Sequence, residues 1–210
     1  MTETSAAVPA APLRTVDGVL LPAPGTYAVD VGHSAVLFAV RHLGLSRVRG
    51  IFGAFEGVVE IADRPEASSV RVDVDVASVD TRLAPRDERL RGEDFFDAAR
   101  HPTMTFRSTR VAPASASVSV PASAPAGDRW AVEGDLTIRG VTRPVTLDVR
   151  FEGGELDPFG GRRIAFTASG EVDRERWGIS WNQVLDSGGL FVGRTVTLDL
   201  EVEAVLRDPA

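Results

Sequence analysis

Apolar and polar residues alternate along most of this chain with the two-residue period that is typical of a β-strand with one buried face. The clearest run covers residues 70–77, in which valine occupies every second position and Arg, Asp, Asp and Ala lie between the valines. The same period predicts further strands over residues 35–43, 51–61, 104–109, 130–138, 145–151, 164–172 and 196–203.

These strands each present one apolar face, and most are joined by turns that are too short for helical crossovers. Neighbouring strands should therefore run antiparallel. Few helices are available to cover the apolar faces, so the sheet must close on itself or fold into two layers. We predict an all-β fold, an eight-stranded antiparallel barrel with one or two short helices, and a sandwich is the alternative. A barrel of this size can enclose one ligand.

One stretch, Thr81–Phe106, breaks the alternation and favours the barrel over the sandwich. Pro85 suits the first turn of a helix, and Gly92 suits the position just after its end. Asp94, which is followed by a second acid three residues later, is typical of another helix start, and Pro102 of its end. We expect two short helical turns that form a lid or rim on the β-rich remainder of the chain.

Two segments differ in composition from the rest of the predicted barrel domain, which we place at residues 26–208. Residues 1–25 are interrupted by prolines and carry no basic residue before Arg14, so we predict a flexible tail and no signal peptide. Residues 113–127 are uncharged and rich in Ala, Ser and Pro, which is typical of a mobile hairpin loop. No apolar run approaches the ~18 residues of a spanning helix. We expect a cytoplasmic protein with no stable membrane insertion.

Charge and composition exclude several classes of function. The formal net charge is −7 and the isoelectric point is near 5.0, which weighs against a nucleic-acid partner, because such binding depends on neutralising phosphates. The chain has no cysteine, so disulfides and thiolate metal sites are excluded. All 23 basic residues are arginine, which excludes lysine Schiff bases and Walker-type phosphate loops. Arginine favours forked contacts with phosphate or carboxylate.

Few residues offer catalytic or metal-binding chemistry. His33, His42 and His101 lack a ligand spacing such as HxxxH, so we expect histidines that hydrogen-bond locally and no metal site. Ser180 lies in half of a hydrolase nucleophile elbow, but Asn182 replaces the second glycine and no strand–helix pattern surrounds it. The sequence contains no recognisable nucleophile–base pair.

The arginines of the interrupting stretch are further candidates for a binding role. Acidic residues lie among them, which favours a solvated surface. Clustered at the rim of a barrel, they could instead hold an anionic headgroup through charge-assisted hydrogen bonds. These arginines are Arg82, Arg86, Arg89 and Arg91.

Four segments, taken together and in order, resemble the YceI-like family of polyisoprenoid-binding proteins. They cover nearly the whole chain after residue 26, and four such segments in order are more specific than any one of them. Arg89 departs from the family pattern, which usually has histidine there, and the loop at 113–127 is longer than is typical. Many members are exported, whereas this chain shows no signal. The four segments are Tyr27–Gly57, Ser78–Ser108, Gly134–Val149 and Trp177–Gly193.

The resemblance implies a lipocalin-like barrel whose apolar interior holds a long isoprenoid chain, in some members a prenyl pyrophosphate or a quinone. It also implies no catalysis, no metal, no cofactor other than the bound lipid, and a homodimer. The main hypothesis is therefore a non-enzymatic carrier of an isoprenoid lipid. An enzyme acting on a phosphorylated or quinone isoprenoid is the alternative from another class, and a packed barrel without a ligand is a third.

Candidate ligand-binding residues fall into two groups. Residues on apolar strand faces should point into the barrel and contact the lipid chain: Phe38, Val40, Phe106, Leu136, Phe166 and Ala168. Polar or amphipathic residues of the matched segments are expected to contact the headgroup at the rim: Arg41, His42, Arg86 and Trp177.

Overall fold

The computed structural model describes residues 12–16, 18–114, 129–186 and 188–207. The strands are β1 (Leu13–Val16), β2 (Val19–Pro22), β3 (Gly25–Val29), β4 (Ala35–His42), β5 (Ser46–Phe52), β6 (Phe55–Ile61), β7 (Ser69–Asp75), β8 (Val79–Asp80), β9 (Thr103–Pro113), β10 (Arg129–Ile138), β11 (Val141–Leu156), β12 (Arg162–Asp173) and β13 (Val192–Leu206). The helices are α1 (Ala84–Arg91) and the 3-10 turns η1 (Val31–His33), η2 (Pro65–Ala67), η3 (Val76–Ser78) and η4 (Arg174–Trp177).

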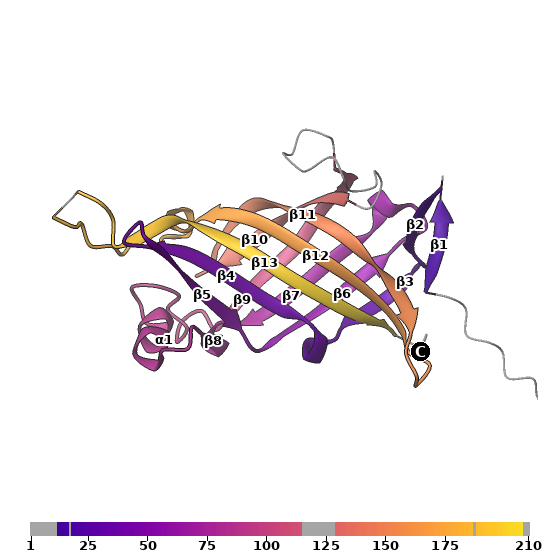
Figure 1. Cartoon of the computed structure of the whole chain (residues 1–210), viewed down its shortest axis with the longest axis horizontal. Coiled ribbons are helices and arrows are strands. Elements are labelled where there is room, and N and C mark those ends of the chain that lie inside the picture. Colours follow the sequence, from indigo (N-terminus) through magenta and orange to yellow (C-terminus); the bar gives the residue numbers. More distant parts are fainter. Residues whose placement is uncertain (1–11, 17, 115–128, 187, 208–210) are drawn as a thin grey trace, which may run out of the picture.

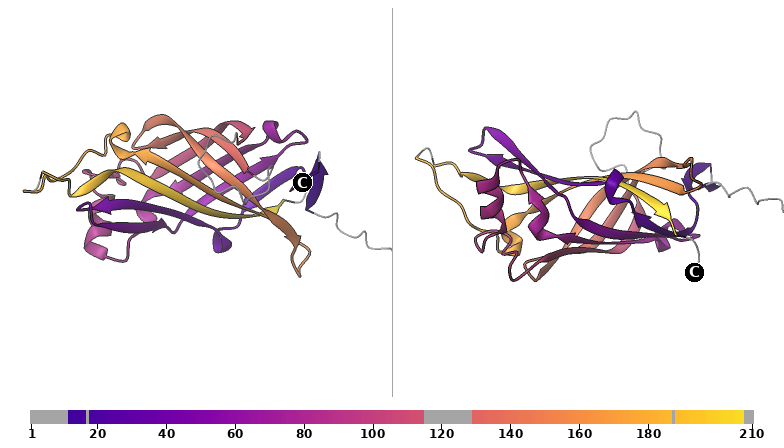
Figure 2. Two further views of the ribbon diagram at one scale, coloured as in Figure 1. Left: turned by 45° about the horizontal axis from the view of Figure 1, so that its top comes forward. Right: turned by 90° about the horizontal axis from the view of Figure 1, so that it is seen from below.

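The strands form the eight-stranded antiparallel barrel that the sequence predicts (Figure 1). Around the barrel the order is β12, β11, β10, β9, β7, β6, β3 and β13, and β13 pairs back onto β12 to close the sheet. β4 continues the line of β3 along β13, and β5, its hairpin partner, continues the line of β6. The barrel is therefore elongated, with α1 at one end and the β1–β2 hairpin at the other (Figures 1 and 2). We call these the α1 end and the hairpin end.

The sheet is interrupted at the α1 end between β5 and β9. β8 pairs with β5 through only two residues, Val79 and Asp80. Side chains of residues 81–102 pack across this interruption instead of a strand. The ring of Phe96 meets that of Phe52 edge-on, with the centroids 5.6 Å apart, and Met104 of β9 belongs to the same apolar cluster. This part of the wall thus depends on side-chain packing and not on a hydrogen-bonded ladder.

The alternation read from the sequence gives each strand one inward apolar face, and these faces form the core. The most deeply buried side chains lie near the two ends of the barrel. Tyr27, Ile164 and Ala204 pack together toward the hairpin end, where the Tyr27 hydroxyl donates a 2.9 Å hydrogen bond to the carbonyl of Ala23. Trp177 is buried at the α1 end, in a cluster with Phe95 and other apolar residues.

Part of the segment predicted to be a flexible tail is folded. β1 and β2 pair antiparallel, with Leu13 opposite Pro22, and Leu21 is buried. Arg14 donates hydrogen bonds to the carbonyls of Pro22 (3.2 Å) and Ala62 (2.7 Å), which ties the hairpin to the end of β6. The prediction was wrong for these strands because burial of leucine against the barrel outweighs the polar and proline-rich composition. Residues 1–11 lie outside the described part of the chain.

The second helix expected within Thr81–Phe106 is not formed. α1 has Pro85 in its first turn and ends just before Gly92, as predicted, but residues 92–101 form only turns and bends. Asp97 adopts a left-handed conformation with φ 52°, which a continuing helix does not allow. Its amide donates to the carbonyl of Gly92 (2.9 Å), and the amide of Phe96 donates to the carbonyl of Leu90 (3.0 Å). The chain therefore turns back so that Phe95 and Phe96 reach the core.

The loop predicted at residues 113–127 falls almost entirely on positions 115–128, outside the described residues, and its mobility stays a prediction. Over the described ranges, no helix is both long and apolar enough to span a membrane.

Gly134 offers a test of the close packing between β9 and β10. It lies at a register shift, and a Cβ there would overlap the ring of Phe106 and lie 2.7 Å from the carbonyl oxygen of Arg107. We expect Gly134→Ala to lower the free energy of unfolding by ~1–3 kcal/mol, as measured by urea denaturation. Gly53→Ala is the matched control, because its Cβ would meet only the Ser78 carbonyl oxygen at 3.8 Å. Equal small effects for both variants would contradict this account.

Candidate ligand-binding site

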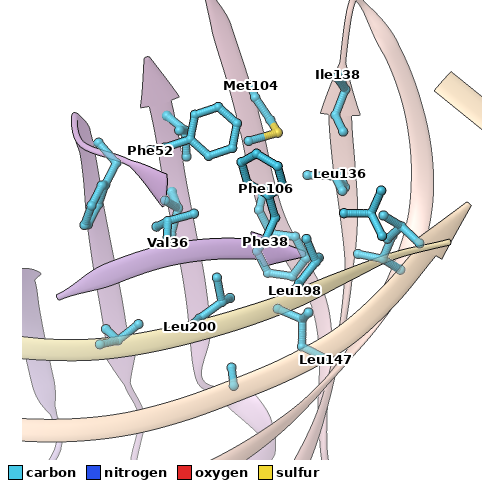
Figure 3. Close-up of a pocket in the computed structure, with 18 of the residues that line it drawn as sticks. Val36, Phe38, Phe52, Met104, Phe106, Leu136, Ile138, Leu147, Leu198 and Leu200 are labelled. Atoms are coloured by element: carbon cyan, nitrogen blue, oxygen red, sulfur yellow. The ribbon is translucent and has the colours of Figure 1, made fainter. Parts of the chain in front are cut away.

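A cavity of about 670 Å³ occupies the interior of the barrel. Its wall is built from inward side chains of nearly every strand, and Figure 3 shows ten of them pointing toward a common space from facing strands. These ten are Val36, Phe38, Phe52, Met104, Phe106, Leu136, Ile138, Leu147, Leu198 and Leu200. An eight-stranded barrel can be filled by side chains or can enclose one ligand, and in this barrel the side chains leave the interior partly unfilled.

The polar residues that border the cavity are found mainly toward its two ends. Arg14, Ser68 and Ser69 lie toward the hairpin end, with Leu21 and Pro22 of β2. The larger group lies at the α1 end and consists of Arg41, His42, Arg86, Arg89 and Arg174. A ligand with a long apolar body and one polar head would fit this distribution, with its head among the arginines.

The structure places all ten predicted site residues around this one cavity. The six residues expected to contact a lipid chain are on its wall. Of the four expected at the rim, His42 and Arg86 border the α1 end, and Arg41 borders it while remaining exposed. Trp177 lies deeper, at 1% exposure, and its indole N–H donates to the carbonyl of Leu136 (3.1 Å). Its nitrogen is thus already committed, and the ligand contacts of all ten stay predictions.

An aromatic and cationic cluster surrounds the opening at the α1 end. The guanidinium of Arg89 stacks on the ring of Trp181, 3.8 Å from its centroid. Trp181 also contacts Phe95 and Phe191, with centroid separations of 5.5 and 6.0 Å. The ring of His42 meets Phe191 edge-on at 4.7 Å. Residues from β4, α1 and the loop before β13 are therefore held together by stacking at this opening.

Arg86 is fixed at the same opening by a buried carboxylate. Asp87, at 6% exposure, accepts hydrogen bonds from the amide (2.8 Å) and the hydroxyl of Thr81. Burial acts to raise the pKa of Asp87, but these hydrogen bonds and the charges of Arg91 and Arg86 outweigh it and lower the pKa. Arg86 in turn donates from Nε to the Thr81 hydroxyl (2.6 Å) and from Nη2 to the Thr81 carbonyl (2.7 Å). Its Nη1 makes no hydrogen bond to the described residues and remains available.

Arg174 organises the loop that forms the other side of the opening. It is 5% exposed and has no carboxylate partner in the described structure. Its guanidinium donates instead to four backbone carbonyls, those of Ile179 (2.5 Å), Trp181 (3.0 Å), Val192 (3.4 Å) and Gly193 (2.9 Å). Burial lowers the pKa of this arginine. The arrangement holds both ends of residues 179–193 against one side chain.

One group of possible metal ligands occurs outside the cavity, within the described residues. Asp30, His33 and Glu203 place their ligand atoms within 4.8 Å of one another. The guanidinium of Arg163 already binds both acids, with Nη1 2.7 Å from Asp30 and 2.6 Å from Glu203. Hydrogen bonds from Arg163 and His33 lower the pKa of Asp30 to about 2. A cation therefore occupies this cluster already, and its geometry is that of an ion-pair network joining β3, β12 and β13.

The sequence matches a known protein family over most of its length. The profile of the YceI-like domain covers residues 27–204, which is nearly all of the barrel. The chain belongs to the YceI-like family. Protein YceI of Escherichia coli O157:H7 is 39% identical over 141 residues, spanning 67% of this chain and 68% of the relative.

Solved structures of YceI-like architecture share the fold. BcnA of Burkholderia cenocepacia superimposes with a TM-score of 0.68 at 23% identity, covering 83% of this chain and 98% of that one. A polyisoprenoid-binding domain from Saccharophagus degradans, implicated in plant cell wall breakdown, gives a TM-score of 0.61 at 17% identity, covering 86% and 98% of the two chains. At these sequence identities the similarity establishes only the barrel fold. The kind of ligand has to be inferred from the cavity.

Sequence reasoning missed two features of the YceI-like site. Arg174 belongs to a short 3-10 turn, and no local pattern indicates that its guanidinium will be buried among carbonyls. The stacking of Arg89 on Trp181 joins residues that are far apart in the chain. Trp181 lay within a matched segment, and its neighbours His42 and Phe191 are both in matched segments as well. A search for aromatic residues shared by those segments would have indicated the cluster.

Removing the guanidinium of Arg174 tests its role in shaping the opening. In Arg174→Met the four carbonyls lose their donor while most of the apolar stem is kept. We expect amide exchange in residues 178–193 to accelerate by at least ~10-fold, because unsatisfied buried carbonyls favour local opening. Hydrogen–deuterium exchange with mass spectrometry measures this. Arg176→Met, at an exposed neighbouring position, is the control and should leave exchange unchanged. Unchanged exchange in both variants would show that the loop is held by its other contacts.

Proposed function

We propose that this YceI-like protein binds a long-chain isoprenoid lipid inside the barrel and carries or stores it without chemical change. The observation that carries the proposal is the cavity, about 670 Å³ in volume, enclosed by apolar side chains along the barrel and bordered by arginines at one end. This volume lies within the ~300–1,000 Å³ range of small-molecule sites. Burial of a hydrocarbon chain at ~25 cal/mol per Å² of apolar surface would supply most of the affinity.

Membership of the family and one structural neighbour support isoprenoid as the chemical class. The Saccharophagus degradans domain with the same barrel is a polyisoprenoid-binding domain. An isoprenoid chain is branched and apolar along its whole length, which suits a wall of Val, Leu and Phe side chains. A polyprenyl phosphate or pyrophosphate, or an isoprenoid quinone, would add the polar head that the α1 end can accept.

The polar groups of the α1 end support binding in preference to catalysis. Arg174 and Arg86 are held by backbone carbonyls and a threonine, and Asp87 is ionised and hydrogen-bonded by Thr81. Groups held in this way can orient a headgroup. An enzyme acting on a phosphorylated or quinone isoprenoid is the second candidate. Incubating ligand-stripped protein with such substrates and analysing products by chromatography separates the two, since a carrier returns its ligand unchanged.

Native mass spectrometry of freshly purified protein tests the lipid proposal, and two tryptophan substitutions sharpen it. Val40→Trp and Ala168→Trp each place a bulky ring on the cavity wall. We expect the co-purified lipid to be lost while the melting temperature is nearly unchanged, because the ring fills existing space. In a packed core the same change would cost ~1–3 kcal/mol.

Ala39→Trp is the matched control, since strand alternation places residue 39 on the opposite face from Val40. It should keep the lipid. Absence of any lipid in the parent protein, combined with strong destabilisation by both cavity variants, would refute the proposed site.

The headgroup end is tested by comparing ligands that have the same chain and either a charged or an uncharged headgroup. We expect Arg86→Gln and His42→Ala to weaken binding of a polyprenyl pyrophosphate by ~10-fold or more, because hydrogen bonds to charged groups contribute ~1.5–3 kcal/mol. Binding of the uncharged alcohol of equal chain length should change little. Tryptophan-fluorescence titration measures both. Arg110→Gln, on the outer surface, is the control. Equal losses for the two ligands would assign these residues to packing.

The oligomeric state and the cellular location of the protein are two further proposals. The homodimer implied by the family resemblance is proposed for this chain, and light scattering coupled to size-exclusion chromatography measures it directly. The cytoplasmic location likewise remains a proposal.

A further inference from the structure

Large apolar side chains are exposed together at the α1 end. Leu45 is 80% exposed, Val184 70%, Leu83 51% and Leu190 39%. They come from three separate segments: the β4–β5 turn, the chain just before α1, and the loop that precedes β13. Val184 and Leu190 form a bridge within that loop, and the loop joins the β4–β5 turn through a 3.0 Å hydrogen bond from the Leu43 amide to the Phe191 carbonyl. The turn and the loop extend beyond the barrel at the same end (Figure 1).

The outer face of the β4–β5 hairpin behind these tips is basic. Arg41 and Arg47 lie directly opposite each other across the two strands, and Arg49 follows Arg47 on the same face. All three are exposed, and within the described residues none forms an ion pair. Like charges in opposed positions destabilise a sheet. The hairpin thus maintains an unfavourable charge pattern in a protein whose formal net charge is −7.

Several arginines on other strands form ion pairs with acids across the sheet. Arg107 is paired with Asp73 across β9 and β7, Arg110 with Glu133 across β9 and β10, and Arg129 with Asp148 across β10 and β11. Arg71, Arg143 and Arg162 also lack an ion pair to the described residues, but they lie singly on three different strands. On the β4–β5 hairpin, three such arginines share one face. An unneutralised basic face beside exposed apolar tips is the combination that binds an anionic lipid surface, through charge attraction and shallow insertion.

The cavity opens toward this surface. Leu83, one of the exposed apolar residues, also borders the cavity, together with Arg86 and Arg89 of α1. The opposite end is occupied by the β1–β2 hairpin, whose Leu21 is buried. A membrane in contact with the α1 end would therefore face the opening directly.

We propose that the α1 end docks on a bilayer that carries anionic headgroups, with Leu45, Val184 and Leu190 inserted at the headgroup level and the basic face of the β4–β5 hairpin against the phosphates. A second copy of the chain fits this surface less well, because a two-fold contact would bring the arginines of both copies together. The net negative charge does not prevent docking, since charges more than ~8 Å away are largely screened at physiological ionic strength.

Docking itself depends only on these surface residues. Its role in lipid exchange rests on the proposed function: the isoprenoid could pass between bilayer and cavity without crossing water. Vesicle binding tests the docking without reference to the cargo, so a failure of docking and a failure of the lipid proposal are distinguishable.

The chain has no cysteine, so single labels can be placed at will. Leu45→Cys carries an environment-sensitive fluorophore at the proposed tip. Phe159→Cys, which replaces a 95% exposed apolar residue on the β11–β12 turn, is the matched control. We expect the label at 45 to shift to the blue and brighten on vesicles of phosphatidylcholine with phosphatidylglycerol, and not on phosphatidylcholine alone. The label at 159 should not respond to either.

Charge removal gives the second measurement. Arg47→Gln combined with Arg49→Gln should weaken sedimentation with the anionic vesicles by ~5-fold for each charge removed. Arg64→Gln combined with Arg207→Gln removes two exposed arginines elsewhere and should leave binding unchanged. No response at position 45, or an equal response at 159, overturns the proposal. A blue shift at 45 that depends on protein concentration without vesicles also overturns it, by assigning the surface to a dimer.

Discussion

Closure of the sheet is the constraint on which the rest of this protein depends. The pairing of β12 with β13 closes the ring of eight strands, and it gives their inward side chains a single shared interior. An eight-stranded barrel is wide enough to be filled by side chains or to enclose one ligand. Here the inward side chains line the interior and leave a cavity of about 670 Å³.

The two ends of the barrel are completed by different means. The hairpin end is covered by β1 and β2, which are tied down by Arg14 through backbone carbonyls. The α1 end is shaped by two buried charged groups, Asp87 and Arg174, each compensated by hydrogen bonds to its neighbours rather than by a direct ion pair. These two groups fix the positions of the arginines and aromatic rings around the opening. The polar chemistry therefore serves mainly to hold an apolar chamber open at one end.

Strand periodicity predicted most of this architecture, and turn chemistry explains most of what it missed. The segment LRTVDGVLLP contains Asp17–Gly18, a strong hairpin signal between two apolar runs, and Gly18 has φ 81°. The prediction of a tail rested on the proline-rich composition and did not use this signal. The second helix was predicted because Asp94, followed by Asp97 three residues later, resembles a helix start. The left-handed conformation of Asp97 instead turns the chain so that the adjacent phenylalanines pack inward.

Some residues of the candidate site could be predicted from the local sequence pattern, and others depend on tertiary contacts. Wall residues such as Phe38 and Leu136 follow from alternation alone, because a strand with one buried face has no freedom to point them elsewhere. Arg174 could not be predicted from pattern, since its four acceptors are carbonyls supplied by a loop that folds over it. The periodicity of a strand indicates which side chains point into the barrel. It contains no information on which distant backbone carbonyls will contact a given guanidinium.

Because the wall is interrupted between β5 and β9, the barrel resists widening less at this place than around the rest of its circumference. Along most of its circumference, widening the barrel would break strand hydrogen bonds in series. At the interruption no strand ladder resists widening. The contacts there include the edge-on rings of Phe52 and Phe96 and a few hydrogen bonds, such as those from Arg91 to carbonyls of the β8 region. The girth of the chamber is thus less constrained at the α1 end, while its depth is limited by the β1–β2 hairpin at the other end. Under the proposed function, such a chamber would sort its guests by length more strictly than by thickness.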